Sequence, residues 1–324
     1  MFGSETQRVS QRDSLSKEWQ PSLDFLDRGR CIEKLPGFST PSQIRWSFQK
    51  GRNAFSFQLI QCTMSVEGLK SKGWGCHFLL KEALRIALAE AWERLLLSPY
   101  LKNSLPGLPL THIGFAAGTN AEAAHESARR ECLERYLLFQ AARGRAELRR
   151  VSPRWGMETL IAWKIEKTWG PLSLFSIDGG VGRTFFAMVQ TSQHWLCDSI
   201  FADASVFAPV RRLLYSIMGS GGGELRIHLP MLGAKSERGV CGGRVKRRLP
   251  RNSWRKQLRS FLPSTSLPQA ASHCSSPVSE LIYPGALMPA VAVAYISWQD
   301  ERNAERLTQE EVFASLICQA SQPH

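Results

Sequence analysis

Two segments of the sequence carry the same acidic pattern, Glu-x-x-Glu-Arg. The pattern is found at Glu90, Glu93 and Arg94, and again at Glu131, Glu134 and Arg135. On a helix, positions i, i+3 and i+4 share one face, and their Cβ atoms lie about 5–6 Å apart. Two such faces brought together would offer four carboxylates in one cleft. Hard divalent cations such as Mg²⁺ bind a few carboxylates and leave positions for phosphate oxygens, so the pattern indicates a metal and nucleotide site.

The pattern also has a purely structural explanation. A Glu–Arg pair at i,i+4 is common on helix surfaces and stabilises a helix by only a few tenths of a kcal/mol. The site interpretation is favoured by the context, because a glycine-containing segment precedes each motif. Residues 71–75 predict a loop, and residues 113–120 predict a short strand or loop that turns tightly. The motifs themselves lie in helices predicted at 80–97 and 121–148.

The remaining patterns predict an α/β (α+β) fold with helices packed on mixed β-sheets. Residues 44–63 alternate like a β-hairpin, with a turn at 51–53. Further helices are expected at 158–169, 208–218 and 310–320, and further strands at 172–177, 184–190 and 281–296. We assign residues 1–40 to a polar leader and 41–320 to one domain, with a basic loop or insertion at about 224–276.

The composition places the chain among ordinary globular proteins. Of its 324 residues, 43% are hydrophobic and 21% are charged. The start of the chain lacks the apolar stretch of a secretory signal, and the longest apolar run, 286–296, is far shorter than the roughly twenty residues that cross a bilayer. Eight scattered cysteines show no metal or redox spacing, which indicates reduced thiols. These features predict a cytoplasmic protein with no membrane partner.

The net charge of +13 is concentrated in one segment. Ten lysines and arginines and a single acid fall within residues 235–259, which therefore supply +9 of the total. This segment is interpreted first as a solvated loop. The alternatives are that it follows the phosphates of a nucleic acid, which we rank as an unlikely partner, or that it docks an acidic peptide or partner protein.

The order of these blocks resembles the YcaO-like family over about residues 68–296. The resemblance rests on Lys72-Gly73 before the first motif and on Ala116-Ala117-Gly118 before the second. A weaker third block lies at 211–218, and Tyr283-Pro284-Gly285 is similar to the family's strand break. The resemblance implies Mg²⁺ and ATP as cofactors, with the metal held by the four motif glutamates. It implies nucleotide contacts from Lys72, Arg94, Asn120 and Arg135.

The resemblance further implies that a backbone amide oxygen of a peptide or protein is activated by phosphorylation. A nucleophile then yields a thioamide, an amidine or an azoline, of which azoline is least expected here because the proline-rich tail of azole-forming members is absent. The implied partners are a peptide or protein substrate, a partner protein of a peptide-modifying system, or a second copy in a homodimer.

Several polar positions of the family pattern are replaced in this chain. Apolar or small residues stand at Ile86, Thr119, Ala123, Tyr215 and Met218. Two hypotheses therefore remain open. Either a reduced Mg-ATP site rests on the four glutamates, or the chain is a catalytically degenerate partner or peptide-binding subunit. The catalytic residues themselves are not predicted.

Overall fold

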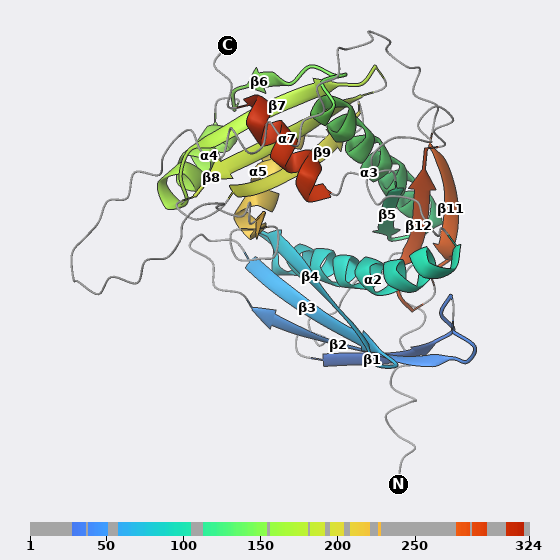
Figure 1. Cartoon of the computed structure of the whole chain (residues 1–324). Helices are drawn as coiled ribbons and strands as arrows, with labels where there is room; N and C mark the ends of the chain where they lie inside the picture. The colour runs from blue at the N-terminus through green and yellow to red at the C-terminus, as the bar shows by residue number, and fades with distance from the viewer. Residues whose placement is uncertain are drawn as a thin grey trace, which may run out of the picture.

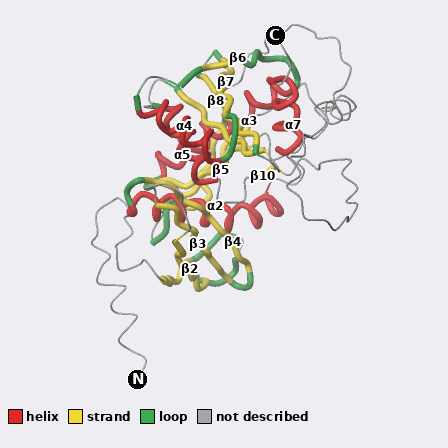
Figure 2. The backbone as a smooth tube through the Cα atoms, turned by 90° about the vertical axis from the view of Figure 1, so that its left-hand side faces the viewer, coloured by secondary structure: helices red, strands yellow, loops and turns green. Residues whose placement is uncertain are grey.

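The computed structural model describes residues 28–36, 38–50, 58–104, 113–153, 156–180, 182–191, 195–203, 208–220, 226–227, 277–285, 287–296 and 309–320. These residues form three sheets with helices packed on them (Figures 1 and 2). The α/β (α+β) class with helices on sheets is thereby confirmed. The sequence predicts mixed sheets, but every strand pairing among the described residues is antiparallel.

The first sheet is a four-stranded meander in the order β1-β2-β3-β4. Its strands are β1 (Arg28–Glu33), β2 (Ser42–Lys50), β3 (Gln58–Val66) and β4 (Leu69–His77). Alternate residues point to opposite faces of a strand, and one face of this sheet is apolar, with buried Ile44, Ile60 and Met64. Helix α2 (Leu80–Ser104) lies across that face (Figure 1). The helix contributes Leu84, Leu88 and Trp92 to the shared core.

The other two sheets surround the second motif helix. One has the order β10-β9-β8-β7-β6, and the other has the order β11-β12-β5. Their strands are β5 (Ile113–Gly118), β6 (Arg149–Val151), β7 (Leu172–Asp178), β8 (Arg183–Gln190), β9 (Trp195–Ala202), β10 (Arg226–Ile227), β11 (Val278–Tyr283) and β12 (Ala290–Tyr295). Helix α3 (Ala121–Ala142) packs on β5 and β12 and reaches β9. Helices α4 (Met157–Thr168), α5 (Pro209–Ser220) and α7 (Gln309–Ala320) complete the described elements.

The β4–α2 and β5–α3 units repeat one packing device. A Cβ atom built on Gly73 in β4 would overlap the backbone of Ala87 and Ala91 in α2. A Cβ atom built on Gly114 in β5 would overlap the backbone of Ala128 and the nitrogen of Cys132 in α3. Each glycine thus lets a helix rest directly on its strand, because no side chain stands between the two backbones. Gly73 and Gly114 are 41 positions apart, which is also the separation of Glu90 and Glu131.

Most elements predicted from the sequence are confirmed, but three expectations are wrong. The helix predicted at 121–148 ends at Ala142, and the chain turns after Arg143. Residues 71–75 are not a loop; they form the centre of β4, where Ser71, Lys72 and Gly73 pair with β3. The glycines that suggested a turn instead serve the close helix contact. The first motif helix does not stop near Pro99 but runs on to Ser104. A proline keeps a helical φ, but it lacks an N–H donor and its ring crowds the carbonyl four residues earlier, so the helix continues through it at a cost.

Three further findings concern the limits of the domain. Strand β1 lies within residues 1–40, so part of the expected leader belongs to the first sheet. The basic segment 235–259 and the turn at 51–53 lie outside the described residues. Among the helices that the structure describes, none is long and apolar enough to cross a membrane.

The close contact between α2 and β4 predicts that one added methyl group at Gly73 destabilises the protein. We expect Gly73→Ala to lower the free energy of unfolding by about 1–3 kcal/mol, because the backbone of α2 would have to move away from β4. Gly68→Ala serves as the control: Gly68 has φ +84° and open space around its Cβ position, so only backbone strain of about 1 kcal/mol is expected there. Urea unfolding of both variants measures the difference, and a Gly73→Ala protein no less stable than Gly68→Ala would contradict the packing argument.

Candidate functional site

Side chains of the first motif helix, α2, form hydrogen bonds with the backbone at the edge of strand β4. Trp74 in β4 donates its backbone N–H to Glu90 Oε2 at 2.5 Å. Arg94 pairs with Glu90 Oε1 at 2.6 Å and donates from Nη1 to the backbone oxygen of Lys72 at 3.0 Å. β4 is the last strand of its sheet. The carboxylate and guanidinium therefore occupy edge positions where a further strand would offer its C=O and N–H.

The second motif helix repeats this arrangement on β5. Phe115 donates its backbone N–H to Glu131 Oε2 at 2.7 Å. Arg135 pairs with Glu131 Oε1 and donates from Nη1 to the backbone oxygen of Ile113 at 2.6 Å. β5 is likewise the last strand of its sheet. We call these two Glu–Arg–strand arrangements the edge clips.

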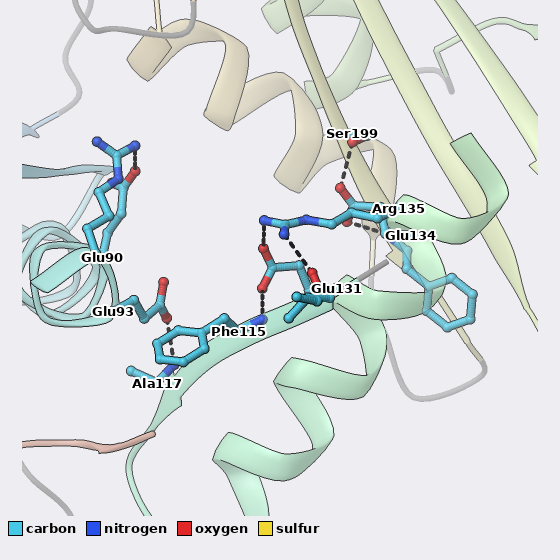
Figure 3. Close-up of polar contacts among 11 residues, drawn as sticks. Glu90, Glu93, Phe115, Ala117, Glu131, Glu134, Arg135 and Ser199 are labelled. Atoms are coloured by element: carbon cyan, nitrogen blue, oxygen red, sulfur yellow. Dashed lines mark hydrogen bonds and ion pairs between the residues drawn. The ribbon is translucent and has the colours of Figure 1, made fainter. Parts of the chain in front are cut away.

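The second glutamate of each motif reaches a strand that comes later in the chain. Glu93 in α2 accepts the backbone N–H of Ala117 in β5 at 2.6 Å. Glu134 in α3 accepts the hydroxyl of Ser199 in β9 at 2.6 Å and the backbone N–H of Phe201 at 3.1 Å. Figure 3 shows the resulting line of carboxylates, in which Glu93 and Glu131 face each other beside β5 and Glu134 turns toward Ser199. The motifs thus connect β4, α2, β5, α3 and β9 in sequence order.

Burial raises the pKa of the two inner carboxyl groups. The pKa of Glu93 lies well above its ordinary value, first because the group is removed from water and then because Glu131 and Glu90 lie nearby; the N–H of Ala117 and the charge of Arg94 oppose this only in part. The pKa of Glu134 is raised to about 7, again chiefly by burial. A carboxyl group in this state favours either a proton or a cation as its partner.

The sequence analysis missed one acid of this region, Asp198 in β9. Its Oδ1 accepts the backbone N–H of Ser199 at 2.8 Å, and its Oδ2 accepts the hydroxyl of Ser216 in α5. Burial raises the pKa of Asp198 to about 6, and its charge contributes to the raised pKa of Glu134. Asp198 stands alone in a strand that was not predicted, so no spacing pattern drew attention to it.

Three of the four predicted nucleotide-contacting side chains have other partners in the structure. Arg94 and Arg135 belong to the edge clips. Asn120 caps α3, because its Oδ1 accepts the backbone N–H of Ala123 at 2.8 Å. Lys72 contributes its carbonyl to a clip and leaves its side chain exposed.

The predicted metal ligands are only partly brought together. Within the described part of the chain, no three His, Cys, Asp or Glu side chains are close enough to hold a metal ion. Glu93 and Glu131 face each other (Figure 3), and their charges interact. Both supply carboxylate oxygens, the donor type that Mg²⁺ prefers, and burial makes a cation near Glu93 favourable. The donor chemistry therefore fits Mg²⁺, while Glu134 is turned to β9.

Fold and site together define an α/β protein whose two β–α units carry matching edge clips. No protein-family model matches the chain, and no curated protein matches it. Among solved structures, the chain is similar to YcaO from Methanopyrus kandleri bound with AMPPCP and Mg²⁺. The match has 13% sequence identity and a TM-score of 0.45, and it covers 53% of this chain and 61% of that chain. This is a partial likeness of fold, and it assigns no activity to the present chain.

The raised pKa of Glu134 predicts a pH effect on stability. A carboxyl group whose pKa is higher in the folded state holds its proton more tightly there, so its contribution to the free energy of unfolding falls with rising pH. The fall begins near the ordinary value of 4.5 and ends near 7. Glu134→Gln removes this titration, and we expect its Tm to fall less than that of the wild type between about pH 5 and about pH 7.5 in EDTA.

Glu126→Gln on the same helix is the matched control for this pH series. Glu126 is partly exposed and paired with Arg130 at 2.9 Å, so its removal changes the same charge without altering a carboxyl group whose pKa is raised. Its pH series should run parallel to the wild type. Parallel curves for wild type and Glu134→Gln would show that Glu134 is not the titrating group.

Proposed function

We propose that this chain is a YcaO-like protein that uses Mg²⁺ and ATP to modify backbone amides of a peptide or protein. The observation that carries the proposal is the position of Glu93, a partly buried carboxylate that faces Glu131 between the two motif helices. The family resemblance supplies the reaction class, which is thioamide or amidine formation, with azoline formation least favoured. A peptide or protein is the substrate.

Glu93 and Glu131 are the residues we assign to the metal, with Glu90 and Glu134 as the outer members of the set. One oxygen of Glu93 is fixed by the N–H of Ala117, which orients the carboxylate beside β5. Glu131 is oriented in the same way by Phe115 and Arg135. When bound, Mg²⁺ would offset the negative charge of a transferring phosphoryl group. The protein contributes prepositioned oxygens that need no rearrangement to meet the cation.

The second candidate function is a catalytically degenerate partner or peptide-binding subunit. It is favoured by helix α5, which carries the third sequence block at 211–218. Tyr215 in α5 makes an edge-to-face contact with Phe78, with ring centroids 5.1 Å apart. Met218 in the same helix is buried in a hydrophobic core. Both stand where the family pattern has a glutamate and a glutamine, so the carboxylate and the amide of that pattern are missing from this helix. Arg94 and Arg135 are also committed to the edge clips. Under this proposal the fold is kept while ATP chemistry is lost.

Three other expectations are also proposals. Nucleic-acid binding through residues 235–259 concerns a segment outside the described residues. A homodimer and a partner protein of a peptide-modifying system are likewise compatible with the fold, and gel filtration of the purified chain measures the first of them.

A thermal-shift titration with ATP and Mg²⁺, against Mg²⁺ alone, separates the two candidate functions. A ligand that binds only the folded state stabilises it by about 2.7 kcal/mol at a hundredfold excess over Kd. We expect a saturable rise in Tm for the wild type. Glu93→Gln should abolish the rise while changing the ligand-free Tm little, because the amide oxygen still accepts the N–H of Ala117.

The control is Glu82→Gln, also in α2, where the glutamate is partly exposed and paired with Arg85 at 2.9 Å. This variant should respond to ATP and Mg²⁺ as the wild type does. No rise in the wild type at millimolar ATP would reject the ATP-dependent enzyme in favour of the partner subunit. An undiminished rise in Glu93→Gln would remove the metal assignment.

A further inference from the structure

Three polar side chains converge where helix α3 passes the outermost strand of its sheet. Arg129 in α3 donates from Nε to Ser279 Oγ in β11 at 3.0 Å, and His125 Nδ1 lies 3.1 Å from the same oxygen. His125 and Arg129 are four residues apart, so they share one face of the helix. β11 is the last described strand of its sheet (Figure 1). We call these three residues the Ser279 cluster.

The packing of α3 on its sheet brings the two helix side chains to β11. Helix α3 rests on Gly114 of β5 through the backbone of Ala128. Gly114 pairs with Ala294 of β12, and Ala294 pairs with Ser279, so the three residues lie in one row across the sheet. Because Ala294 is small and fully buried, longer side chains of the helix extend over it and reach Ser279. The close contact at Gly114 therefore also sets the position of the cluster.

The hydrogen bonds within the cluster leave several N–H donors unused. A guanidinium has five N–H groups and no acceptor, whereas a serine hydroxyl has one donor and two lone pairs. Ser279 therefore accepts from Arg129 and directs its own proton to Nδ1 of a neutral His125, which places the imidazole proton on Nε2. Among the described residues, neither this Nε2–H nor the Nη groups of Arg129 have a hydrogen-bond partner.

The positive charge of Arg129 has no carboxylate partner within the described part of the chain. Glu126 in the same helix pairs instead with Arg130 at 2.9 Å. Glu280, the next residue of β11, accepts a tyrosine hydroxyl at 2.9 Å and lies on the other face of the strand. Glu122, at the start of α3, is exposed and forms no ion pair with Arg129. The cluster thus presents an exposed guanidinium whose one described partner is a neutral hydroxyl.

The Ser279 cluster lies on the other side of α3 from the candidate cation site. Successive residues of a helix are about 100° apart, so Arg129 is turned about 200° from Glu131, two positions later. Accordingly, Glu131 contacts β5 while Arg129 contacts β11, with β12 between these two strands. A ligand of the cluster is therefore separate from the cation and nucleotide of the proposed function.

A phosphate group matches the donors of the cluster. A guanidinium binds phosphate oxygens through two parallel N–H bonds, and such charge-assisted bonds are roughly twice as strong as neutral ones. The imidazole N–H and the rotatable serine hydroxyl approach from other directions, which suits a tetrahedral group with three free oxygens better than a planar carboxylate. We propose that His125, Arg129 and Ser279 form a binding site for a phosphate group, which joins α3 to β11. The group is either free phosphate or a phosphoryl group carried by a polypeptide.

Titration of the full chain with inorganic phosphate, at constant ionic strength and in EDTA, tests the site. The ring N–H signal of His125 in an NMR spectrum reports on the cluster itself, and its absence in His125→Gln identifies it. We expect a saturable shift of this signal with phosphate and none with chloride. Acetate should bind at least about tenfold more weakly, because it offers fewer oxygens and less charge. Equal affinity for acetate and phosphate would reject the phosphate assignment.

Substitutions of Arg129 should weaken phosphate binding in a graded manner. Arg129→Gln should raise the phosphate concentration at half-shift at least about tenfold, because the charge and the paired N–H bonds are both lost. Arg129→Lys keeps the charge without the planar fork, so its value should fall between those of Arg129→Gln and the wild type. Glu122→Gln should lower the half-shift concentration about twofold, since it removes a nearby negative charge.

The control for these variants is Arg149→Gln. Arg149 is an exposed arginine of β6 that pairs with Glu147 at 2.8 Å, and its loss should change phosphate binding by less than about twofold. The proposal fails if phosphate leaves the His125 signal of the wild type unmoved. It also fails if Arg129→Gln and Arg129→Lys both bind phosphate as the wild type does.

A short peptide with one phosphoserine, compared with the same peptide carrying serine, distinguishes the two sources of the phosphate group. Tighter binding of the phosphopeptide than of inorganic phosphate would assign the site to a phosphorylated polypeptide, and equal or weaker binding would assign it to free phosphate. Binding of the serine peptide as tight as that of the phosphopeptide would contradict the proposal. The inference does not depend on the proposed function: Glu93→Gln, which should lose the response to ATP and Mg²⁺, should keep the phosphate shift of His125.

Discussion

The arrangement of this molecule depends on how the backbone groups at two sheet edges find hydrogen-bond partners. An outermost strand presents N–H and C=O groups that no further strand satisfies, and leaving them buried without a partner is costly. Here an i,i+4 Glu–Arg pair does this twice, with the carboxylate accepting the N–H and the guanidinium donating to the C=O two residues earlier. Such a pair is worth little on an open helix surface. Against a strand edge it fixes the rotation and height of a whole helix.

The same constraint explains why the carboxylates gather where they do. Once Glu90 and Glu131 hold α2 and α3 on their own strands, the next turn of each helix brings Glu93 to β5 and Glu134 to β9. The fold thereby concentrates negative charge between its β–α units, where burial makes that charge expensive. The third unit, β9 with α5, carries a reversed version, since the strand supplies the acid, Asp198, and the helix supplies the hydroxyl, Ser216. The same glutamates therefore hold the helices on their strands and form the candidate cation site.

The sequence revealed the parts of this arrangement that follow local periodicity. The helical face of each motif, the hairpin of β2 and β3, and the strands β7 and β8 all showed regular spacing and are confirmed. The sequence did not reveal β4, because Gly73 and Gly75 suggested a turn when they serve the contact with α2. Nor did it reveal the partners of the arginines, which are backbone atoms 22 residues earlier in both clips. Every residue type supplies the same backbone C=O, so a hydrogen bond to it depends on tertiary placement and cannot be recognised from the sequence.

Closing an edge with side chains has a consequence for how copies of this protein can assemble. A strand from another molecule could extend β4 or β5 only by first breaking a Glu–Arg pair and its two backbone bonds, so growth of either sheet in that direction is blocked. The opposite ends of these sheets are β1 and β11, which have partners on one side only in the described fold. Any assembly through continuous sheets would therefore have to pass through the outer sides of β1 or β11, or through the ends of the third sheet at β6 and β10. The direction of self-association is restricted by the same two ion pairs that position the helices.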